Sequence, residues 1–272
     1  MTRPRARRWV VACLTAVALA AGSAAEGAPP ESGDGFALKG AVVSPKHPLF
    51  AGQRKIALHY AFAAPDPLDL RIRVLRVRSG KSVRSWTERD ARPGERLERP
   101  WDGLNRRGRP VPDGRYEFRV GPAGAADRFA ARLKLRGHVF PVDGPHGTRG
   151  AVGEFHAPRN GGRIHEGFDI TADCGTRLVA ARGGEVQRAG YDPVLYGNYV
   201  LIDAAKSKQD LFYAHMIDPS AAGEGERVYT NQPLGQIGQT GNAAGTPCHL
   251  HFEIHVGGEP VDPEPYLRRW DD

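Results

Sequence analysis

The sequence lacks any low-complexity tract long enough to suggest a disordered chain, and its 40% apolar and 25% charged residues are typical of globular proteins. Its first half lacks a helical period of any length, and the 34 Gly and 22 Pro of the whole chain favour turns over long helices. A chain of 272 residues is long enough to bury a substantial core, so we expect two folded domains. These features predict a folded, turn-rich protein.

A strong net charge is missing as well, once the first residues are set aside. The formal charge of +7 falls to +3 when Arg3, Arg5, Arg7 and Arg8 are left out. So small a charge gives no support for a nucleic-acid partner, and we expect none.

No apolar run has the length of a typical membrane-spanning helix. The stretch from Trp9 to Ala21 follows several arginines and precedes small residues, and this pattern predicts a secretory signal peptide over residues 1–25. We therefore expect an exported chain that is secreted, periplasmic or cell-wall associated, without a stable membrane span after cleavage. An uncleaved membrane anchor is the alternative. The polar, Pro- and Gly-containing residues 26–35 are predicted to be a linker.

Residues 36–136 show short runs with partial period-2 alternation, separated by Gly, Pro and Asp, and this pattern favours a small β-sandwich. The alternation is clearest where Leu70, Ile72 and Val74 are interleaved with Arg71 and Arg73. The predicted strands are Val42–Pro45, Ile56–Ala61, Leu68–Val77, Arg115–Val120 and Arg128–Leu135.

The segment 101–116 contains an Asp-Gly turn followed by a strand in which Tyr116 and Phe118 alternate with charged residues. This segment resembles the signature of Ig-like domains related to the flagellar hook-capping protein. The resemblance covers about a dozen residues and implies an Ig-like domain that is either a spacer or binding module or a simple packing domain. We find no catalytic cluster there.

Residues 137–272 are rich in Gly and His and again favour strands, which predicts a second β domain. The predicted strands are Thr176–Ala180, Gly184–Ala189, Tyr199–Ile202, Leu211–His215 and His249–Val256. We therefore expect an all-β chain in which an Ig-like β-sandwich precedes a second, antiparallel β domain.

Four histidines fall in three compact places within this second region. They are His165, four residues before Asp169; His215; and the pair His249 and His251. Imidazoles and one carboxylate form a ligand set that suits zinc, and three protein ligands leave a fourth position for water. Because residues two apart in a strand point to the same side, the last two histidines can face one cleft.

The motifs HxGxD, YxH and HLHFE occur in this order, and together they resemble the signature of the M23 (lysostaphin/LytM-type) zinc metallopeptidases. The resemblance covers roughly residues 138–268. It implies that His165, Asp169 and His251 hold one zinc ion per chain. It also implies that His249 is the general base and that His215 stabilises the oxyanion.

Other candidates lack a partner at ligand spacing. His255 lies about 13 Å along the strand from His251, too far to bind the same ion, and we expect it at the rim of the site. Glu166 is assigned no catalytic role because no second histidine lies four residues beyond His165. We expect ordinary surface or loop histidines at His47, His59, His138, His146 and His156.

Cysteine is scarce, and of the three residues Cys13 lies in the predicted signal peptide. The remaining Cys174 and Cys248 suggest one disulfide in an exported chain, which would tie the first ligand segment to the last. The alternatives are two buried free thiols or cysteines that add to a metal site.

Together these patterns predict a zinc metalloendopeptidase that hydrolyses peptide cross-links in bacterial peptidoglycan, with unidentified protein partners. The substrate class comes from the resemblance, since the chemistry of the residues alone supports metal-assisted amide hydrolysis. The main alternative is a catalytically silent M23-like domain that binds the wall or regulates an amidase. Such domains usually lack ligands. A third interpretation makes the first domain a hook- or envelope-assembly part.

Overall fold

A computed structural model describes residues 35–271, so the predicted signal peptide and nearly all of the predicted linker lie outside the described residues. Antiparallel strands dominate the fold, which confirms the all-β prediction. The α-helix that the described part contains is α1 (Glu264–Trp270). This helix was not predicted, because seven residues are too few to display a periodic pattern. Within residues 35–271 no helix is both long enough and apolar enough to cross a bilayer.

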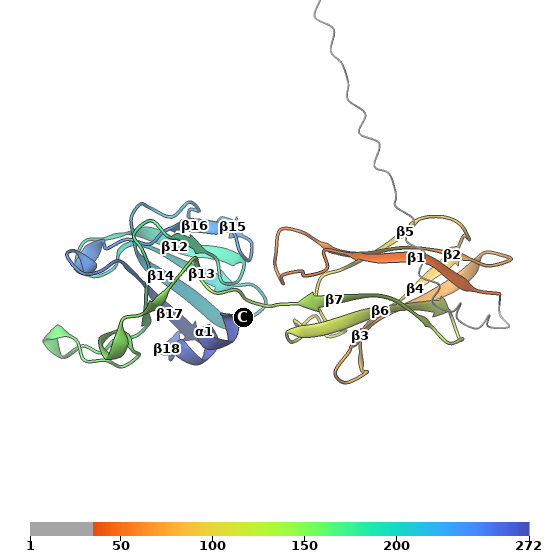
Figure 1. The fold of residues 1–272 in the computed structure, drawn as a ribbon, viewed down its shortest axis with the longest axis horizontal. Coiled ribbons are helices and arrows are strands. Elements are labelled where there is room, and N and C mark those ends of the chain that lie inside the picture. The colour runs from red at the N-terminus through yellow and green to blue at the C-terminus, as the bar shows by residue number, and fades with distance from the viewer. Residues whose placement is uncertain (1–34, 272) are drawn as a thin grey trace, which may run out of the picture.

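The amino-terminal body consists of two antiparallel sheets that face each other (Figure 1, right). One sheet has the strand order β1-β2-β5 and the other β4-β3-β6-β7. The strands are β1 (Ala37–Ser44), β2 (Ile56–Ala63), β3 (Leu68–Arg76), β4 (Ser82–Ala91), β5 (Leu97–Trp101), β6 (Gly114–Pro122) and β7 (Arg128–Leu135).

The core of this body lies between the two sheets. Leu58 and Phe62 of β2 pack in one cluster with Ile72 of β3 and with Tyr116 and Phe118 of β6. These side chains are nearly or fully buried, as the period-2 alternation of each strand requires. The arrangement is a β-sandwich, as predicted. Its similarity to hook-capping Ig-like domains stays a prediction.

The carboxy-terminal body is built on a large antiparallel sheet (Figure 1, left). Its strand order is β15-β12-β13-β14-β17-β10-β9, with β18 paired to β17, and a smaller sheet has the order β16-β11-β8. The bounds are β8 (Val142–Asp143), β9 (Gly147–Thr148), β10 (Phe168–Thr171), β11 (Arg177–Val179), β12 (Gly184–Asp192), β13 (Gly197–Ala204), β14 (Gln209–Met216), β15 (Arg227–Val228), β16 (Pro233–Gln236), β17 (His249–Val256) and β18 (Glu259–Val261). Three short 3-10 turns lie at Gly150–Gly153, Asn160–Gly162 and Gly241–Ala243.

A few specific contacts join the two bodies. The Thr230 hydroxyl donates a hydrogen bond to the carbonyl oxygen of Phe50, and the Thr230 N–H donates to that of Ala51. The Arg182 guanidinium lies 4.4 Å from the centre of the Phe50 ring. Each body keeps its own hydrophobic core, so these contacts fix a junction rather than extend a core.

Candidate metal centre

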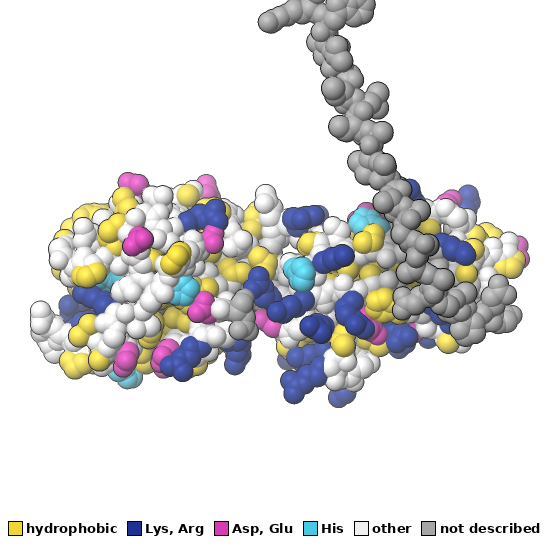
Figure 2. Space-filling model, viewed as in Figure 1, with side chains coloured by type: hydrophobic (Ala, Val, Ile, Leu, Met, Phe, Trp, Pro, Cys, Tyr) yellow, Lys and Arg dark blue, Asp and Glu magenta, His cyan; other side chains and the backbone are white. Residues whose placement is uncertain are grey.

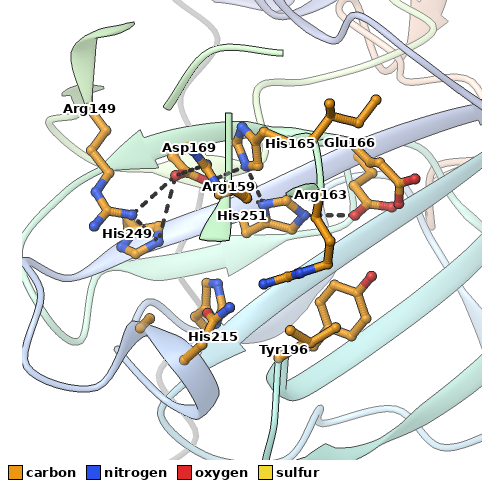
Figure 3. Close-up of a pocket in the computed structure, with 15 residues that line it drawn as sticks. Arg149, Arg159, Arg163, His165, Glu166, Asp169, Tyr196, His215, His249 and His251 are labelled. Atoms are coloured by element: carbon orange, nitrogen blue, oxygen red, sulfur yellow. Dashed lines mark hydrogen bonds and ion pairs between the residues drawn. The ribbon is translucent and has the colours of Figure 1, made fainter. Parts of the chain in front are cut away.

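Strand β17 places its histidines on the side of the sheet opposite to the core. Leu250, Phe252 and Ile254 are fully buried in the core, so alternation turns His249 and His251 to the other face. β17 pairs with β10 on one side and with β14 on the other. His251 therefore lies between two neighbouring strands that also carry predicted site residues (Figure 3).

Three side chains bring one ligand atom each to a common point. Nε2 of His165 lies 2.8 Å from Nδ1 of His251 and 3.0 Å from Oδ1 of Asp169. The third separation, from Nδ1 of His251 to Oδ1 of Asp169, is 3.1 Å. Ligands at about 2.0–2.1 Å from a tetrahedral ion lie about 3.3 Å apart, so the three atoms fit three corners of a zinc coordination sphere.

Further hydrogen bonds hold the rings of these histidines. Nδ1 of His165 lies 2.8 Å from the carbonyl oxygen of Glu154. Nε2 of His251 lies 2.7 Å from Glu253, and the second carboxylate oxygen of Glu253 lies 2.6 Å from His255. Such outer partners fix the tautomer and orientation of metal-binding histidines. No role was predicted for Glu253, although its place two residues after His251 indicates that the two share a strand face.

The electrostatics of this cluster favour a positive charge. Burial would by itself raise the pKa of the Asp169 carboxyl, but hydrogen bonds and charges from His165 and His251 hold it well below its usual value. Burial would likewise lower the pKa of His251, but the carboxylates of Asp169 and Glu253 raise it to about 9. Both carboxylates therefore favour positive charge at His251 and at the atoms that converge on it.

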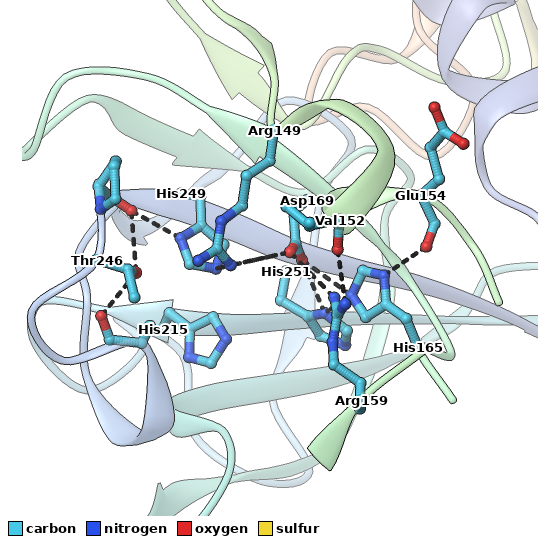
Figure 4. A network of polar contacts seen from close by, with 12 residues as sticks. Arg149, Val152, Glu154, Arg159, His165, Asp169, His215, Thr246, His249 and His251 are labelled. Atoms are coloured by element: carbon cyan, nitrogen blue, oxygen red, sulfur yellow. Dashed lines mark hydrogen bonds and ion pairs between the residues drawn. The ribbon is translucent and has the colours of Figure 1, made fainter. Parts of the chain in front are cut away.

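Two arginines approach the other oxygen of Asp169 (Figure 4). Nη1 of Arg149 lies 3.2 Å and Nη2 of Arg159 lies 3.4 Å from Oδ2. Arg159 also donates to the carbonyl oxygen of Val152, which fixes its side chain. Sequence reasoning missed both arginines because they lie in loops before β10 and belong to no motif. Their bonds leave Oδ1 as the oxygen that faces the two imidazoles.

The remaining predicted residues, His215 and His249, line the same cleft (Figure 3). Their ring centres are 5.0 Å apart. Nδ1 of His249 lies 2.8 Å from the carbonyl oxygen of Pro247, and Nδ1 of His215 lies 2.9 Å from that of Thr240. In each ring Nδ1 therefore carries the hydrogen and Nε2 is an acceptor, which in His249 lies 3.3 Å from the donor Nη1 of Arg149.

The backbone of His215 makes its position possible. In a regular strand His215 would share the face of Tyr213, which is fully buried in the core. His215 instead has a φ of +65°, a left-handed conformation that is uncommon for a non-glycine residue. This turn directs the imidazole into the cleft. No sequence pattern predicts the left-handed conformation.

The surroundings of both histidines disfavour the protonated form. Burial lowers the pKa of His215 to about 3, with further lowering by His251 and His249. Burial also lowers the pKa of His249, and hydrogen bonding to Pro247 only partly offsets it. Neutral imidazoles with unprotonated Nε2 atoms are able to accept protons from a substrate or from water.

Close packing sets the segment that carries His165 and Asp169 against β17. A Cβ atom on Gly167 would lie 2.6 Å from the carbonyl oxygen of Phe252 and 2.8 Å from Cε1 of His251. Only a glycine permits this approach.

A disulfide supports the same junction. Cys174 and Cys248 are bonded, with their Cα atoms 5.3 Å apart, which confirms the predicted pairing. The bond joins the loop after β10 to the start of β17.

Most of the other predictions on histidines concern positions away from the cluster. His255 contacts Glu253 but does not reach the three converging atoms. Glu166 is exposed and lines the cleft. His138 lies in a loop, as expected, but it is partly buried and stacks on Trp270 at 4.4 Å instead of facing solvent. The imidazole ring of His138 packs beside α1 on Trp270, which explains why this histidine is not fully exposed.

Comparison with known proteins identifies the region that contains this cluster. Residues 163–263 match peptidase family M23, so the carboxy-terminal region contains an M23 peptidase family domain. The DD-carboxypeptidase/endopeptidase Mpg of Neisseria meningitidis serogroup B is 38% identical over 101 residues, which are 37% of this chain and 22% of that protein. The murein hydrolase activator NlpD of Escherichia coli is 34% identical over 122 residues, or 44% of this chain and 30% of that protein.

A solved structure was also matched, the catalytic domain of lysostaphin from Staphylococcus simulans. It is 26% identical with a TM-score of 0.39, and the match covers 46% of this chain and 92% of that domain. The chain spans less than half the length of the curated relatives it matches. Those relatives include both hydrolases and an activator of hydrolases.

Proposed function

We propose that the protein is an exported zinc-dependent endopeptidase that hydrolyses peptide bonds in bacterial peptidoglycan. The observation that carries this proposal is the convergence of ligand atoms from His165, Asp169 and His251 in a cleft that His215 and His249 also line. Zinc is the metal that M23 peptidases typically use. A disulfide is consistent with export, because such bonds persist in oxidising compartments.

In this proposal His165, Asp169 and His251 hold one zinc ion. When bound, zinc supplies Lewis acidity, which lowers the pKa of water and polarises a carbonyl group. Arg149 and Arg159 keep Asp169 oriented through Oδ2, and Glu253 keeps His251 oriented through Nε2.

His249 and His215 have the proton-transfer and charge-stabilising roles. Nε2 of His249 lies 3.9 Å from Oδ2 of Asp169, so a water molecule at the cluster has a proton acceptor beside it. His215 stabilises the oxyanion of the attacked peptide when a proton taken from solvent is bound at its Nε2, so that the Nε2–H group donates to that oxygen. Negative charge that develops beside the ring favours that protonated form.

The substrate side of the cleft is basic. Arg149, Arg159 and Arg163 all line it together with Glu166. Wall peptides carry free carboxylates, and guanidinium groups are well suited to bind them. We propose that Arg163 orients the peptide, while Arg149 and Arg159 orient Asp169.

We also propose the division of the exported chain into residues 36–136 and 137–272. Two separate hydrophobic cores support this division. The first domain would be the spacer or binding module, and the second would contain the site.

A second candidate function is a silent M23-like domain that activates another wall hydrolase. The similarity to a murein hydrolase activator favours it. The presence of all three ligand residues, with both cleft histidines beside them, favours the enzyme instead.

Zinc analysis combined with peptide release from purified peptidoglycan separates the two candidates. We expect about one zinc ion per chain and release of peptides by residues 26–272, with both lost in His251→Ala. Stoichiometric zinc without cleavage of any wall type would support the silent domain. Cleavage that persists without zinc would refute the metal mechanism.

A further inference from the structure

The charge of the protein is divided unevenly between its two bodies. Residues 36–136 contain 23 Lys and Arg against 10 Asp and Glu, a formal net charge of +13. Residues 137–272 contain 11 Lys and Arg against 18 Asp and Glu, a formal net charge of −7. Figure 2 shows the dark-blue basic side chains gathered on the right-hand body. A small overall charge therefore conceals a strongly basic unit joined to an acidic one.

Strand alternation collects many of these basic residues on one surface. Arg71 and Arg73 of β3 lie between fully buried residues and so point away from the core. In the strand register Arg73 lies opposite Arg119 of β6, and Arg115 lies opposite Lys134 of β7. We call this surface the basic face. It comprises Arg71, Arg73, Arg115, Arg119, Arg132 and Lys134.

Two carboxylates neutralise only part of this face. Asp127 lies 3.2 Å from Nε of Arg119 and also accepts a hydrogen bond from Arg73. Glu117 pairs with Arg119 and Arg132. Counting these two acids, the six basic residues leave a surplus of +4.

Part of the surplus has no local partner. Within residues 35–271, neither Arg115 nor Lys134 has a carboxylate oxygen within 4.0 Å, and both side chains are exposed. Like charges directly opposite each other on a sheet destabilise it. The positive charges of Arg115 and Lys134 are therefore available to an acidic ligand.

We infer that the basic face binds peptidoglycan through the carboxylates of its stem peptides and holds the second body on its substrate. This inference rests on the proposed function in taking the cell wall as the target. Apart from the arginines that line its cleft, the second body carries a net negative charge, which opposes its approach to a carboxylate-rich polymer. The basic face supplies the opposite charge at a fixed distance from the cleft.

An anionic membrane offers similar charge but fits the face less well. Membrane binding by a surface usually needs apolar side chains that enter the acyl region. The large apolar side chains exposed there in the described part of the chain are Phe129, opposite Arg119 in the register, and Val77, whose N–H donates to the carbonyl oxygen of Arg115. Arg132 lies 5.5 Å from the centre of the Phe129 ring. The face is thus mainly a charged surface.

Co-sedimentation of residues 26–272 with purified, insoluble peptidoglycan tests the inference. A chelator in the buffer prevents hydrolysis, so that binding is measured alone. The test variant is Arg115→Glu/Lys134→Glu, which reverses two exposed, unpaired charges. The control is Arg188→Glu/Lys208→Glu, which changes the net charge equally on exposed positions of the second body. Circular dichroism establishes that each variant is folded.

We expect the test variant to bind about tenfold more weakly and the control to bind nearly as well as the parent, because screened charges act mainly at short range. Peptidoglycan whose carboxylates have been amidated should bind the parent about as weakly. Equal losses in both variants, or unchanged binding to amidated peptidoglycan, would overturn the inference. Binding to anionic lipid vesicles in preference to peptidoglycan would overturn it as well.

The same variants distinguish this inference from the proposed activity. Suppose that the test variant binds more weakly than the parent but that the parent releases no peptide in zinc-containing buffer. This result refutes the endopeptidase activity and supports the inference. If the protein releases peptides and the substitutions leave its binding to peptidoglycan unchanged, the inference is refuted and the proposed activity is not.

Discussion

The carboxylate of Glu253 lies 2.7 Å from Nε2 of His251, on the side of the ring opposite to the nitrogen that faces Asp169. The two residues share one face of β17, so the strand itself fixes their relative position. A carboxylate in this position orients the imidazole and increases its basicity as a ligand.

Replacing Glu253 with Gln should therefore weaken zinc binding by about 10–100-fold, because the amide holds the ring less firmly and carries no charge. Competition against a chromogenic chelator measures the zinc affinity. Glu259→Gln, an exposed position on neighbouring β18, is the matched control and should keep the parent affinity. An unchanged affinity in Glu253→Gln would show that Asp169 alone positions His251.

Substitution of either cleft histidine should impair catalysis without weakening metal binding. His249→Ala and His215→Ala are expected to keep zinc, since neither residue belongs to the three converging ligands. Peptide release should fall by about 10²–10⁴-fold in each variant, the usual contribution of a general acid or base. Steady-state peptide release and metal analysis on the same samples make the comparison. Near-normal release from either variant contradicts the role proposed for that histidine.

Gly167 should be sensitive to the addition of a single methyl group. The Cβ atom of Gly167→Ala would meet backbone and ring atoms of β17 at 2.6–2.8 Å, so the segment with His165 must move away. We expect a loss of about 1–3 kcal/mol in the free energy of unfolding, together with weaker zinc binding. Gly223→Ala is the control, since its added Cβ meets nothing within 4 Å. Equal urea midpoints for the two variants would argue against close packing at Gly167.

Because of His138, the free energy of unfolding of the protein should depend on pH. Burial, followed by the charge of Arg182, lowers the pKa of His138 to about 3 in the folded protein, against 6.5 ordinarily. Between these values the unfolded chain binds the proton more readily. The stabilising effect of neutral His138 is therefore complete above about pH 6.5 and is lost as the pH falls towards 3.

His138→Phe keeps a planar ring against Trp270 but cannot bind a proton. The parent should lose stability relative to this variant by at most about 1.4 kcal/mol per pH unit below pH 6.5, and by less because His138 is partly exposed. Urea unfolding at pH 7, 5.5 and 4.5 measures the difference. His47→Gln, at an exposed position, serves as the control. Parallel pH profiles for the parent and His138→Phe would refute the prediction.

Much of the strand pattern could be predicted because burial on one face leaves a period of two. β7 and β17 have the predicted bounds, and the inward residues Leu70, Ile72 and Val74 are fully buried. β4 (Ser82–Ala91) was missed because it is an edge strand with mostly half-buried polar residues, which removes the apolar signal. β10 (Phe168–Thr171) was not predicted either.

The site was predictable only in part for similar reasons. Motif order indicated His165, Asp169 and His251, and the scarcity of cysteine indicated the disulfide. Arg149 and Arg159 could not be found, since loops bring them to Asp169 without a local pattern.

By itself the sequence determined which residues share a strand face and in which order the chemistry-bearing residues occur, because side-chain alternation is a local property of the backbone. The tertiary structure decided that His165 and His251, 86 residues apart, meet within hydrogen-bond distance. It also decided that the left-handed backbone at His215 turns this ring away from the core and into the cleft. Both depend on which strands pair and how they pack, and the whole buried core fixes this rather than any local segment.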